Sequence, residues 1–472
     1  MDFAFFIRKL KEKILSLTLQ LKEAIKMLDE AAAKNEELEK RVNELENLIN
    51  KKTKKVVKKN SRNSNLPPSK DIYRPKRNQS LRKKSDKKPG GQAGHKGHFL
   101  EMSKTPNKII PMISKVCEGC GNYLNSDKKQ LIESRQEIEL PPTQSIVYQY
   151  DSYGIACECG CLNTGNFPDR LKNKIQYGPR VRAMINYMSN YQYVPYKRLQ
   201  FFFEDVFSLH FSQGTIYNTL KRTAGKSSGI YAFLKNIIEH SEVVGGDETG
   251  VKVNGKLYYN WVWQNQKITF IACESSRRKD NIYKHFKHGF PRAILVSDRY
   301  AAQLSTPSKG YQVCWSHLMR HINYLIESED NPWLHKLIDL YRAAKKLEKE
   351  KPEWSRRDRE IIKLENELNQ LLLERVDEKL FKETRILCNS LNMNRNGILT
   401  FLYHKDVPSH NNASEQAIRN AKVKMKISGQ FKSGQNYFAI MRSIIDTLKK
   451  NNKPILESLL KIEKDVDLSF GF

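Results

Sequence analysis

The stretch SEVVGGDETGVKV, residues 241–253, begins as a β-branched strand and then presents two glycines, Asp247 and Glu248. The later segments LYYNWVWQ, ITFIACE, RAILVSD and YQVCW are also rich in β-branched and aromatic residues. Three consecutive strands with short turns, followed by two strands separated by helical or loop segments, are typical of a mixed α/β sheet. The stretch therefore predicts that the first strand of such a sheet ends at Asp247.

A second apolar strand also finishes on a carboxylate, at Asp298 in AILVSDRYAAQ. Side chains at the ends of neighbouring strands lie about 5 Å apart, so Asp247 and Asp298 could bind one cation. Mg²⁺ prefers oxygen ligands and commonly binds through one or two protein carboxylates and a substrate phosphate. Glu248 is a weaker candidate, because adjacent strand residues point to opposite faces. The alternative for each acid is an ordinary solvated turn.

A third carboxylate has an ordinary explanation when it is taken alone. Glu415, in SHNNASEQAIRNAKVKMKISG, lies in the first turns of a predicted helix that begins near Ser409, and Arg419 follows four residues later. Such a pair contributes only roughly a few tenths of a kcal/mol and needs no function. The basic residues of this helix could contact phosphate or form a solvated face: Arg419, Lys422, Lys424 and Lys426.

The first 50 residues keep one heptad pattern without a break. One core position is filled by Ile7, Ile14, Leu21, Leu28, Asn35, Val42 and Ile49, and the other by Leu10, Leu17, Ala24, Ala31, Leu38 and Leu45. This pattern predicts a coiled coil, and a single Asn in the core favours a parallel two-stranded state. We therefore expect a homodimer or a higher oligomer. The alternative, one amphipathic helix packed on its own domain, is disfavoured by the narrow apolar seam.

The chain carries a formal net charge of +30, which is concentrated in one segment. Residues 51–110 hold 19 Lys or Arg against three acids, and Pro-Pro and Gly-Gly pairs interrupt them. This composition predicts a flexible basic arm, a solvated linker that can also contact nucleic acid. DNA is a more plausible partner than membrane. Since no run of about 18 apolar residues occurs, we expect a cytoplasmic, nucleoid-associated protein without a membrane segment.

Two groups of cysteines lie within residues 111–165. Cys117 and Cys120 in CEGCG, and the cysteines of CECGC, flank RQEIELPPTQSIVYQYDSYGI, which alternates like strands. Short-spaced cysteine pairs around a β-rich insert predict a small zinc-binding module, and disulfides are disfavoured in the cytoplasm. Cys157 and Cys159 are the preferred second pair of ligands, but Cys161 is an alternative.

Residues 166–240 have a helical pattern with a break before Ser212, which we expect to cap the second helix of a pair. That helix carries Lys221 and Arg222. The pair could be a helix-turn-helix that binds DNA, but a plain helical connector fits the pattern equally well.

The remaining segments also have helical patterns. Residues from about 325 to 400 lack a strand pattern and predict a helical insertion within a domain that spans residues 241–440, with a hairpin broken at Pro352. Residues 441–472 form an amphipathic helical tail. CWSHLMRH places Cys314, His317 and His321 at helical spacing, although a buried Cys and a capping His explain this group without a second zinc ion.

The motifs DETGVKVNGKLYYNWVW, SDRYAAQ, QVCWSHLMRH and NNASEQAIR, in this order, resemble those of the insertion sequence 66 family of bacterial DDE transposases. The zipper, NSRNSNLPPSKD, GGQAGHKGH and the cysteine pairs match the N-terminal order of that family. The resemblance thus covers nearly the whole chain. It implies a ribonuclease-H-like catalytic core with the triad Asp247, Asp298 and Glu415, and it makes Cys314 and His317 supporting residues near the active site.

The resemblance also implies a reaction, in which a strand is cut at the end of a mobile element and the freed 3′-OH attacks target DNA. Asp247 and Asp298 would hold two Mg²⁺ or Mn²⁺ ions, and Glu415 would bind the second. Companion proteins of the same element are possible partners. Gln416 stands where the family usually has Arg, and CECGC replaces a frequent C-x2-C pair, so the zinc ligands stay open. The alternatives are a structure-selective nuclease and a non-catalytic DNA-binding protein or inactive transposase remnant.

Overall fold

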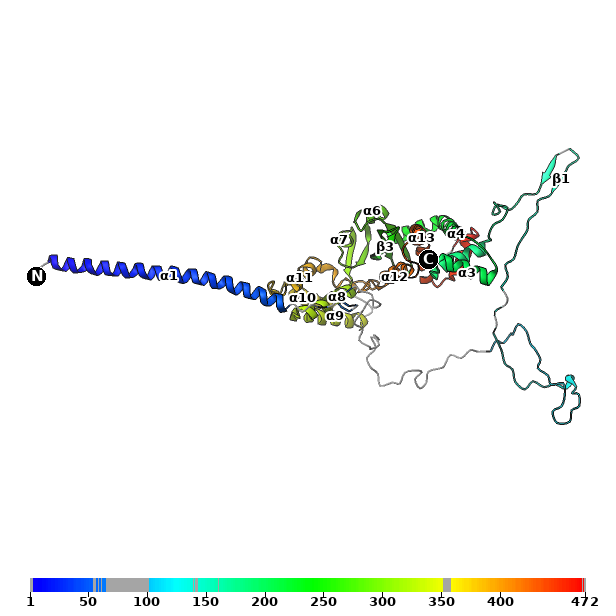
Figure 1. Cartoon of the computed structure of the whole chain (residues 1–472), viewed down its shortest axis with the longest axis horizontal. Helices are drawn as coiled ribbons and strands as arrows, with labels where there is room; N and C mark the ends of the chain where they lie inside the picture. The colour runs from blue at the N-terminus through cyan, green and yellow to red at the C-terminus, as the bar shows by residue number, and fades with distance from the viewer. Residues whose placement is uncertain are drawn as a thin grey trace. The chain divides into compact units, whose positions relative to one another are not determined.

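The computed structural model describes residues 3–53, 57, 59–60, 62–64, 102–138, 140, 143–159, 161–350, 358–468 and 470. The chain divides into two units, which are drawn in Figure 1: residues 1–73, 168–200 and 211–472 form the first, and residues 74–167 and 201–210 form the second. Most of the predicted basic arm, and Pro352, lie outside the described residues. Among the described helices, none is both long enough and apolar enough to cross a membrane.

A five-stranded mixed sheet lies at the centre of the first unit. Its strands are β3 (Val243–Val253), β4 (Lys256–Gln264), β5 (Thr269–Glu274), β6 (Phe290–Ser297) and β7 (Ser308–Val313), in the order β5-β4-β3-β6-β7. The first three strands pair antiparallel, while β3, β6 and β7 pair parallel through connections that contain α6 (Asp280–His285) and α7 (Ala301–Leu304). The predicted mixed α/β sheet is therefore confirmed.

The prediction that the first strand ends at Asp247 is wrong. β3 continues to Val253, and Asp247 pairs with Val262 of β4. Only the parallel pairing of β3 with β6 ends near this point, because its last pair is Gly245 with Val296. The strand can continue because its antiparallel pairing with β4 supplies backbone partners beyond that point.

The two glycines of β3 are needed because of what packs against them. A Cβ on Gly245 would lie 2.7 Å from Asn411 Oδ1 and 2.8 Å from Ser414 Oγ, and a Cβ on Gly246 would lie 2.8 Å from Gln303 Oε1. The glycines therefore allow the backbone of β3 to approach side chains on both faces of the sheet, and they do not terminate the strand.

Two C-terminal helices cover one side of the sheet. Residues of α12 (Asn412–Ser428) and α13 (Gln435–Lys450) join a buried cluster with Val262 and Ile271. Ser443 Oγ of α13 accepts from the Ile271 N–H of the edge strand β5 at 2.8 Å. The boundary expected between residues 440 and 441 falls inside α13, so this part of the predicted tail belongs to the core.

The predicted helices occupy most of residues 179–240, while residues 166–178 form no helix. They are α2 (Pro179–Asn186), the π-helix η3 (Tyr187–Tyr191), α3 (Tyr196–Phe207), α4 (Gln213–Lys226) and α5 (Ser228–Glu239). Ser212 caps α4 as expected, because its Oγ accepts from the Thr215 N–H at 3.1 Å.

Helix α4, the second helix of the predicted helix pair, has one buried and one exposed side. Thr223 of α4 contacts both Asn186 and Glu463, and Glu463 lies on α14 (Ile455–Glu463). Lys221 and Arg222 are exposed. A DNA-binding role for this helix pair stays a prediction.

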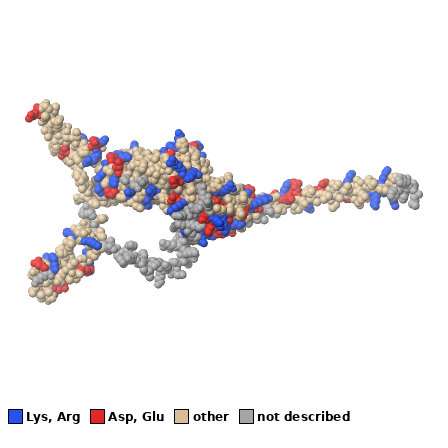
Figure 2. Space-filling model, turned by 180° about the vertical axis from the view of Figure 1, so that it is seen from behind, with Lys and Arg blue, Asp and Glu red and all other residues tan. Residues whose placement is uncertain are grey.

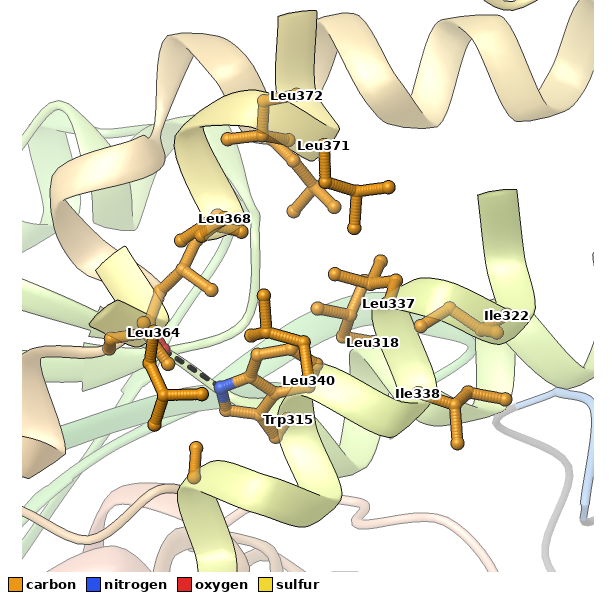
Figure 3. Packing of buried hydrophobic residues seen from close by; sticks show 14 of the residues in the cluster. Trp315, Leu318, Ile322, Leu337, Ile338, Leu340, Leu364, Leu368, Leu371 and Leu372 are labelled. Atoms are coloured by element: carbon orange, nitrogen blue, oxygen red, sulfur yellow. Dashed lines mark hydrogen bonds between the residues drawn. The ribbon is translucent and has the colours of Figure 1, made fainter. Parts of the chain in front are cut away.

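The predicted helices of the insertion are present, and they share one buried cluster with α8 (Trp315–Ser328) and with Ile294 and Val296 of β6. They are α9 (Pro332–Glu350), α10 (Arg359–Leu373) and α11 (Lys382–Met393). Figure 3 shows side chains of α8, α9 and α10 packed around the Trp315 indole, whose N–H donates to the Ile398 carbonyl at 2.8 Å. The indole also stacks on Tyr341 with ring centroids 4.2 Å apart. This packing fixes the position of α8, which carries His317 and Arg320.

The second unit is less regular than the sequence predicts. Its strands are β1 (Gly154–Ala156) and β2 (Leu162–Thr164), and the described residues from 131 to 153 form none. The apolar residues of that segment, such as Ile138 and Tyr148, are exposed. The expectation of a β-rich insert is therefore wrong for most of its length, because alternation stabilises a strand only where a partner strand and a core receive its apolar face.

The N-terminal residues form one continuous helix, α1 (Phe3–Thr53). The apolar seam of the heptads is exposed along it, with Leu21 62% and Leu28 69% exposed. A seam of this length requires a partner helix, so the coiled-coil dimer stays our expectation.

The seam can be tested by placing charges on it. Leu21→Asp combined with Leu28→Asp should convert the dimer to a monomer, because both residues occupy core positions of the heptad. Leu15→Asp with Leu19→Asp is the matched control, since those exposed leucines lie off the seam. Light scattering after gel filtration measures the mass. A monomeric wild type, or two variants with equal mass, would contradict the zipper.

The close contacts of Gly245 can be tested by Gly245→Ala. The new methyl group would overlap the amide of Gln264 on β4, the amide of Asn411 and the hydroxyl of Ser414, so we expect the free energy of unfolding to fall by about 1–3 kcal/mol. Gly229→Ala, in α5, is the control, because a Cβ there meets nothing within 4 Å. Thermal unfolding compares the two variants; equal melting temperatures would mean that α12 does not pack this closely on β3.

Candidate functional site

The register of β3 and β6 brings Asp247 and Asp298 together. The last parallel pair is Gly245 with Val296, and Asp247 and Asp298 each lie two residues further along their own strand direction. Neighbouring strands lie about 5 Å apart, so residues at matching positions have adjacent side chains. The two acids are near enough for the charge of Asp298 to raise the pKa of Asp247, although only Asp298 follows the end of a strand.

Asp247 lies in a strongly negative and buried environment. Burial first, and then the charges of Glu248, Asp298 and Glu415, raise the pKa of Asp247 well above its ordinary value. Its Oδ1 accepts from the Glu248 N–H at 2.8 Å, and Asp298 Oδ1 accepts from the Tyr300 N–H at 3.0 Å. Carboxylates gathered in this way are stabilised by a cation, and their oxygen atoms are the donors that Mg²⁺ prefers.

Asn411 fixes the start of α12 on the strand that carries Asp247. Its Nδ2 donates to the Gly246 carbonyl at 2.7 Å, and its backbone N–H donates to Cys314 Sγ at 3.1 Å. Ser414 Oγ donates to Asn411 Oδ1 at 2.6 Å. Asn411 is buried. These bonds bring the first turn of α12 to the sheet, and sequence analysis missed Asn411 because an Asn before a helix looks like an ordinary cap.

Glu415, in that first turn, contacts two residues of α8 and forms an ion pair with Arg320. Its Oε1 lies 2.9 Å from Arg320 Nη2 and 3.4 Å from His317 Nδ1. The ordinary explanation, a pair with Arg419 on its own helix, is not what the described structure contains. Glu415 also raises the pKa of Asp247 through its charge. The three predicted acids are therefore close enough to interact electrostatically.

A tighter group of potential ligands includes only one of these acids. Within the described part of the chain, the Cys314, His317 and Glu415 ligand atoms all lie within 4.8 Å of one another, whereas Asp247, Asp298 and Glu415 form no such group. Burial raises the pKa of the Cys314 thiol. Since Cys314 Sγ accepts from Asn411 and His317 contacts Glu415, both residues support the start of α12.

Glu248 points to the opposite face of the sheet from Asp247. It is buried and accepts from Arg277 Nε at 2.7 Å and from Gln303 Nε2 at 3.2 Å. The Arg277 guanidinium lies 3.9 Å from the centroid of the Tyr300 ring. The Glu248 carboxylate is thus bound by the Arg277 guanidinium and the Gln303 amide. This agrees with the expectation that Glu248 points away from the face that carries Asp247.

A cavity of about 720 Å³ opens beside Asp298. Basic side chains contribute much of its lining, including Lys59, Arg277, Arg299 and Arg320. Arg299 Nη2 donates to His321 Nδ1 at 2.8 Å, and burial together with Arg299 lowers the pKa of His321 to about 4. His321 therefore belongs with Arg299 and not with Cys314 and His317. The cavity suits an anionic ligand next to Asp298.

Basic residues of α12 extend from Glu415 along one face of the helix. Arg419, Lys422 and Lys426 are exposed and lie four, seven and eleven residues after Glu415, so the helical repeat aligns them. Figure 2, which draws one face of the molecule, shows basic side chains mixed with acidic ones over the surface and no single block of charge. On this face, a phosphate contact would depend on local alignments such as this one.

Lys424 does not belong to this face, which corrects the sequence prediction. It lies on the opposite side of the helix, buried, with its Nζ 5.5 Å from the centroid of Phe438 and 5.9 Å from that of Phe431. Burial lowers the pKa of Lys424 to about 8.

The predicted zinc ligands form two separate turns. The Gly121 N–H donates to the Cys117 carbonyl at 2.9 Å, and the Cys157 N–H donates to the Cys161 carbonyl at 2.8 Å. The N–H of Cys120 lowers the pKa of Cys117, and the N–H of Cys161 lowers that of Cys159. Among the described residues, these cysteines are not gathered into one group of ligands. A turn that lowers the pKa of a cysteine favours the thiolate, which is the form that binds zinc. Which of these cysteines would bind zinc stays open.

Comparison with known proteins identifies the family. A family model described as Transposase IS66 family matches residues 174–437, which is more than half of the chain and includes the sheet, the paired acids and α12. The chain therefore belongs to the IS66 family of transposases. A second family model, of a family of unknown function (DUF6444), matches residues 18–101, from the zipper into the basic arm. No curated protein matches the chain.

The raised pKa of Asp247 predicts competition between protons and metal. A group with a raised pKa keeps its proton above about pH 4, the ordinary Asp value. A cation binds the ionised form, so Mn²⁺ affinity should fall as the pH falls from neutrality, with protons released on binding. Calorimetry in buffers of different ionisation enthalpy measures both.

Two variants control this experiment. Asp247→Asn should abolish the pH-dependent binding, while Asp406→Asn, at an exposed acid, should leave it unchanged. Mn²⁺ affinity that is independent of pH in the wild type would contradict a role for Asp247 as ligand.

Proposed function

We propose that this transposase cleaves and joins DNA strands by metal-dependent phosphoryl transfer, with Asp247, Asp298 and Glu415 as its acidic triad. One observation carries the proposal: Asp247 and Asp298 lie at matching positions of adjacent parallel strands, and Asp298 lines a cavity with several basic residues. The order and directions of the five strands support a ribonuclease-H-like core.

The carboxylate oxygens are the donors in this site. Asp247 and Asp298 would hold Mg²⁺ or Mn²⁺ together, and Glu415 would complete the site from α12. A divalent ion bound there would activate the attacking oxygen and offset the negative charge that develops at the phosphate. The three acids are partly buried, so water screens their charges less than it would on an open surface.

The neighbouring residues position the acids and the phosphate. Asn411 and Cys314 hold the start of α12, and Arg320 and His317 orient the Glu415 carboxylate. Arg299, next to Asp298 in the sequence, lines the cavity and can donate to a phosphate oxygen. We assign these residues positioning and phosphate-binding roles.

DNA beyond the cavity would be contacted by exposed basic residues. Arg419, Lys422 and Lys426 lead away from Glu415 on one helical face, where they would bind backbone phosphates without reading sequence. The zipper would pair two copies of the chain so that one assembly binds both element ends. Zinc bound by Cys117, Cys120, Cys157 and Cys159 would join the two cysteine turns of the second unit into one module.

The catalytic proposal is tested with DNA that carries the terminal repeats flanking the gene. In Mg²⁺, the wild type should cut and join this duplex, and Asp298→Ala should reduce both activities by at least about 100-fold, the scale expected when one preorganised charged group is lost. Asp406→Ala is the matched control at an exposed acid. Gel analysis of labelled strands measures both steps.

Two outcomes would count against the proposal. Equal cleavage by the wild type and Asp298→Ala would exclude the triad. Binding without cleavage in either protein would favour a non-catalytic DNA-binding protein.

A further inference from the structure

A short turn of the N-terminal arm docks on the helix that supports the active site. Asn63 is 3% exposed, and its Nδ2 donates to Glu327 Oε2 at 2.6 Å. Asn323 Nδ2 donates to the Arg62 carbonyl at 3.3 Å. Glu327 and Asn323 lie four residues apart on α8, the helix that also carries Arg320. Two contacts one helical turn apart hold the segment against one face of α8.

The turn is also braced by its own side chains. Asn60 Oδ1 accepts from the N–H groups of Arg62 and Asn63 at 2.8 and 3.2 Å, and Asn63 Oδ1 accepts from the Asn60 N–H at 2.7 Å. Ser64 Oγ donates to the Asn60 carbonyl at 2.6 Å. Asn and Ser side chains commonly brace turns through such backbone contacts. The segment therefore has a defined shape to present to α8, although it lies within a composition that predicts flexibility.

The docked turn forms part of the cavity beside Asp298. Lys59, Asn63 and Ser64 line this cavity together with Asp298 and Arg299. With the turn in place the cavity still measures about 720 Å³, within the range of roughly 300–1,000 Å³ typical of small-ligand pockets. The turn therefore lines the site and leaves room for a nucleotide-sized group.

Most charges in the cavity already have partners within the protein. Arg277 pairs with Glu248, and Arg320 pairs with Glu415. The Glu329 carboxylate accepts from the N-terminal N–H groups of α11 at 3.0 and 2.9 Å, so it acts as a helix cap.

Two cavity cations differ from these. Arg299 hydrogen-bonds the uncharged groups of His321 and Ser390. Neither Lys59 nor Arg299 forms an ion pair with another described residue. Lys59 and Arg299 would therefore both attract an anion that enters the cavity.

We propose that the Asn60–Ser64 turn is a fixed part of the active site and that Lys59 binds a phosphate of the DNA strand held beside Asp298. This inference rests on the proposed function and extends it to the segment matched by the family of unknown function, residues 18–101. Lys59 follows the end of α1, at Thr53, by only six residues. The turn therefore places the active site within a short length of chain from the zipper.

The first test measures binding of a short fluorescent single-stranded oligonucleotide to the full chain, without Mg²⁺ and over a range of salt concentrations. Lys59→Ala should reduce the slope of log affinity against log salt by about 0.7, the value for one phosphate contact on a single strand. Lys363→Ala, on an exposed face of α10 and outside the cavity, is the matched control and should keep the wild-type slope.

A second test concerns the docking contact. Asn63→Asp keeps the Oδ1 that Asn60 needs but places a carboxylate against Glu327, so the turn should detach and the slope should fall as in Lys59→Ala. Adding Glu327→Gln supplies a donor for the new carboxylate and should restore the slope.

The outcome of these binding experiments does not depend on catalysis, because they contain no metal ion. If cleavage fails but the slopes change as predicted, the proposed reaction is wrong and the phosphate contact stands. A wild-type slope in Lys59→Ala, or tighter binding in Lys59→Ala or Asn63→Asp, would overturn the inference; tighter binding would mean that the turn obstructs the site.

Discussion

The parallel pairing of β3 with β6 is the constraint on which the site depends. It sets Gly245 opposite Val296 and so places Asp247 and Asp298 at matching positions. A slip of one residue would turn Asp247 to the other face of the sheet, where Glu248 meets Arg277. The register is held by the buried strand residues on both sides, so the same packing that stabilises the sheet also brings the two acids together.

A second constraint joins the C-terminal helix to this sheet. Asn411 bonds the Gly246 carbonyl, and this contact is possible because Gly245 carries no side chain. Glu415 is thereby placed beside acids that precede it by more than one hundred residues. The helical insertion lies between these segments in sequence, but its core is anchored through Trp315 to α8. The insertion can therefore separate the motifs along the chain while α8 supplies Arg320 to Glu415.

Much of the fold could be predicted from local patterns. The five strands, the helical insertion and the Ser212 cap follow from periodicity and capping chemistry, which depend on neighbouring residues. The end of β3 was mispredicted because glycines commonly terminate strands, and only the distant side chains of Asn411 and Gln303 explain them here. The strands expected between the cysteine pairs do not form, because an alternating pattern cannot reveal whether a partner strand exists.

The candidate site was only partly visible in the sequence. Asp247 and Asp298 follow from the strand pattern, and Glu415 follows only from the ordered motifs. Arg320, Asn411 and the arm turn contact the site across long separations that no local pattern records. Lys424 is a different case. It follows Glu415 by nine residues, which places it on the opposite side of an ideal helix, so helical phase alone could have excluded it.

The central claim is that Asp247 and Asp298 together bind a cation at one shared site. Crystals soaked in Mn²⁺ and measured by anomalous diffraction test this claim directly, because the anomalous signal locates the ion. We predict an anomalous peak from an ion that both carboxylates coordinate, and the loss of this peak in Asp298→Ala. A peak confined to Cys314 and His317, or an ion that persists unchanged in Asp298→Ala, would contradict it.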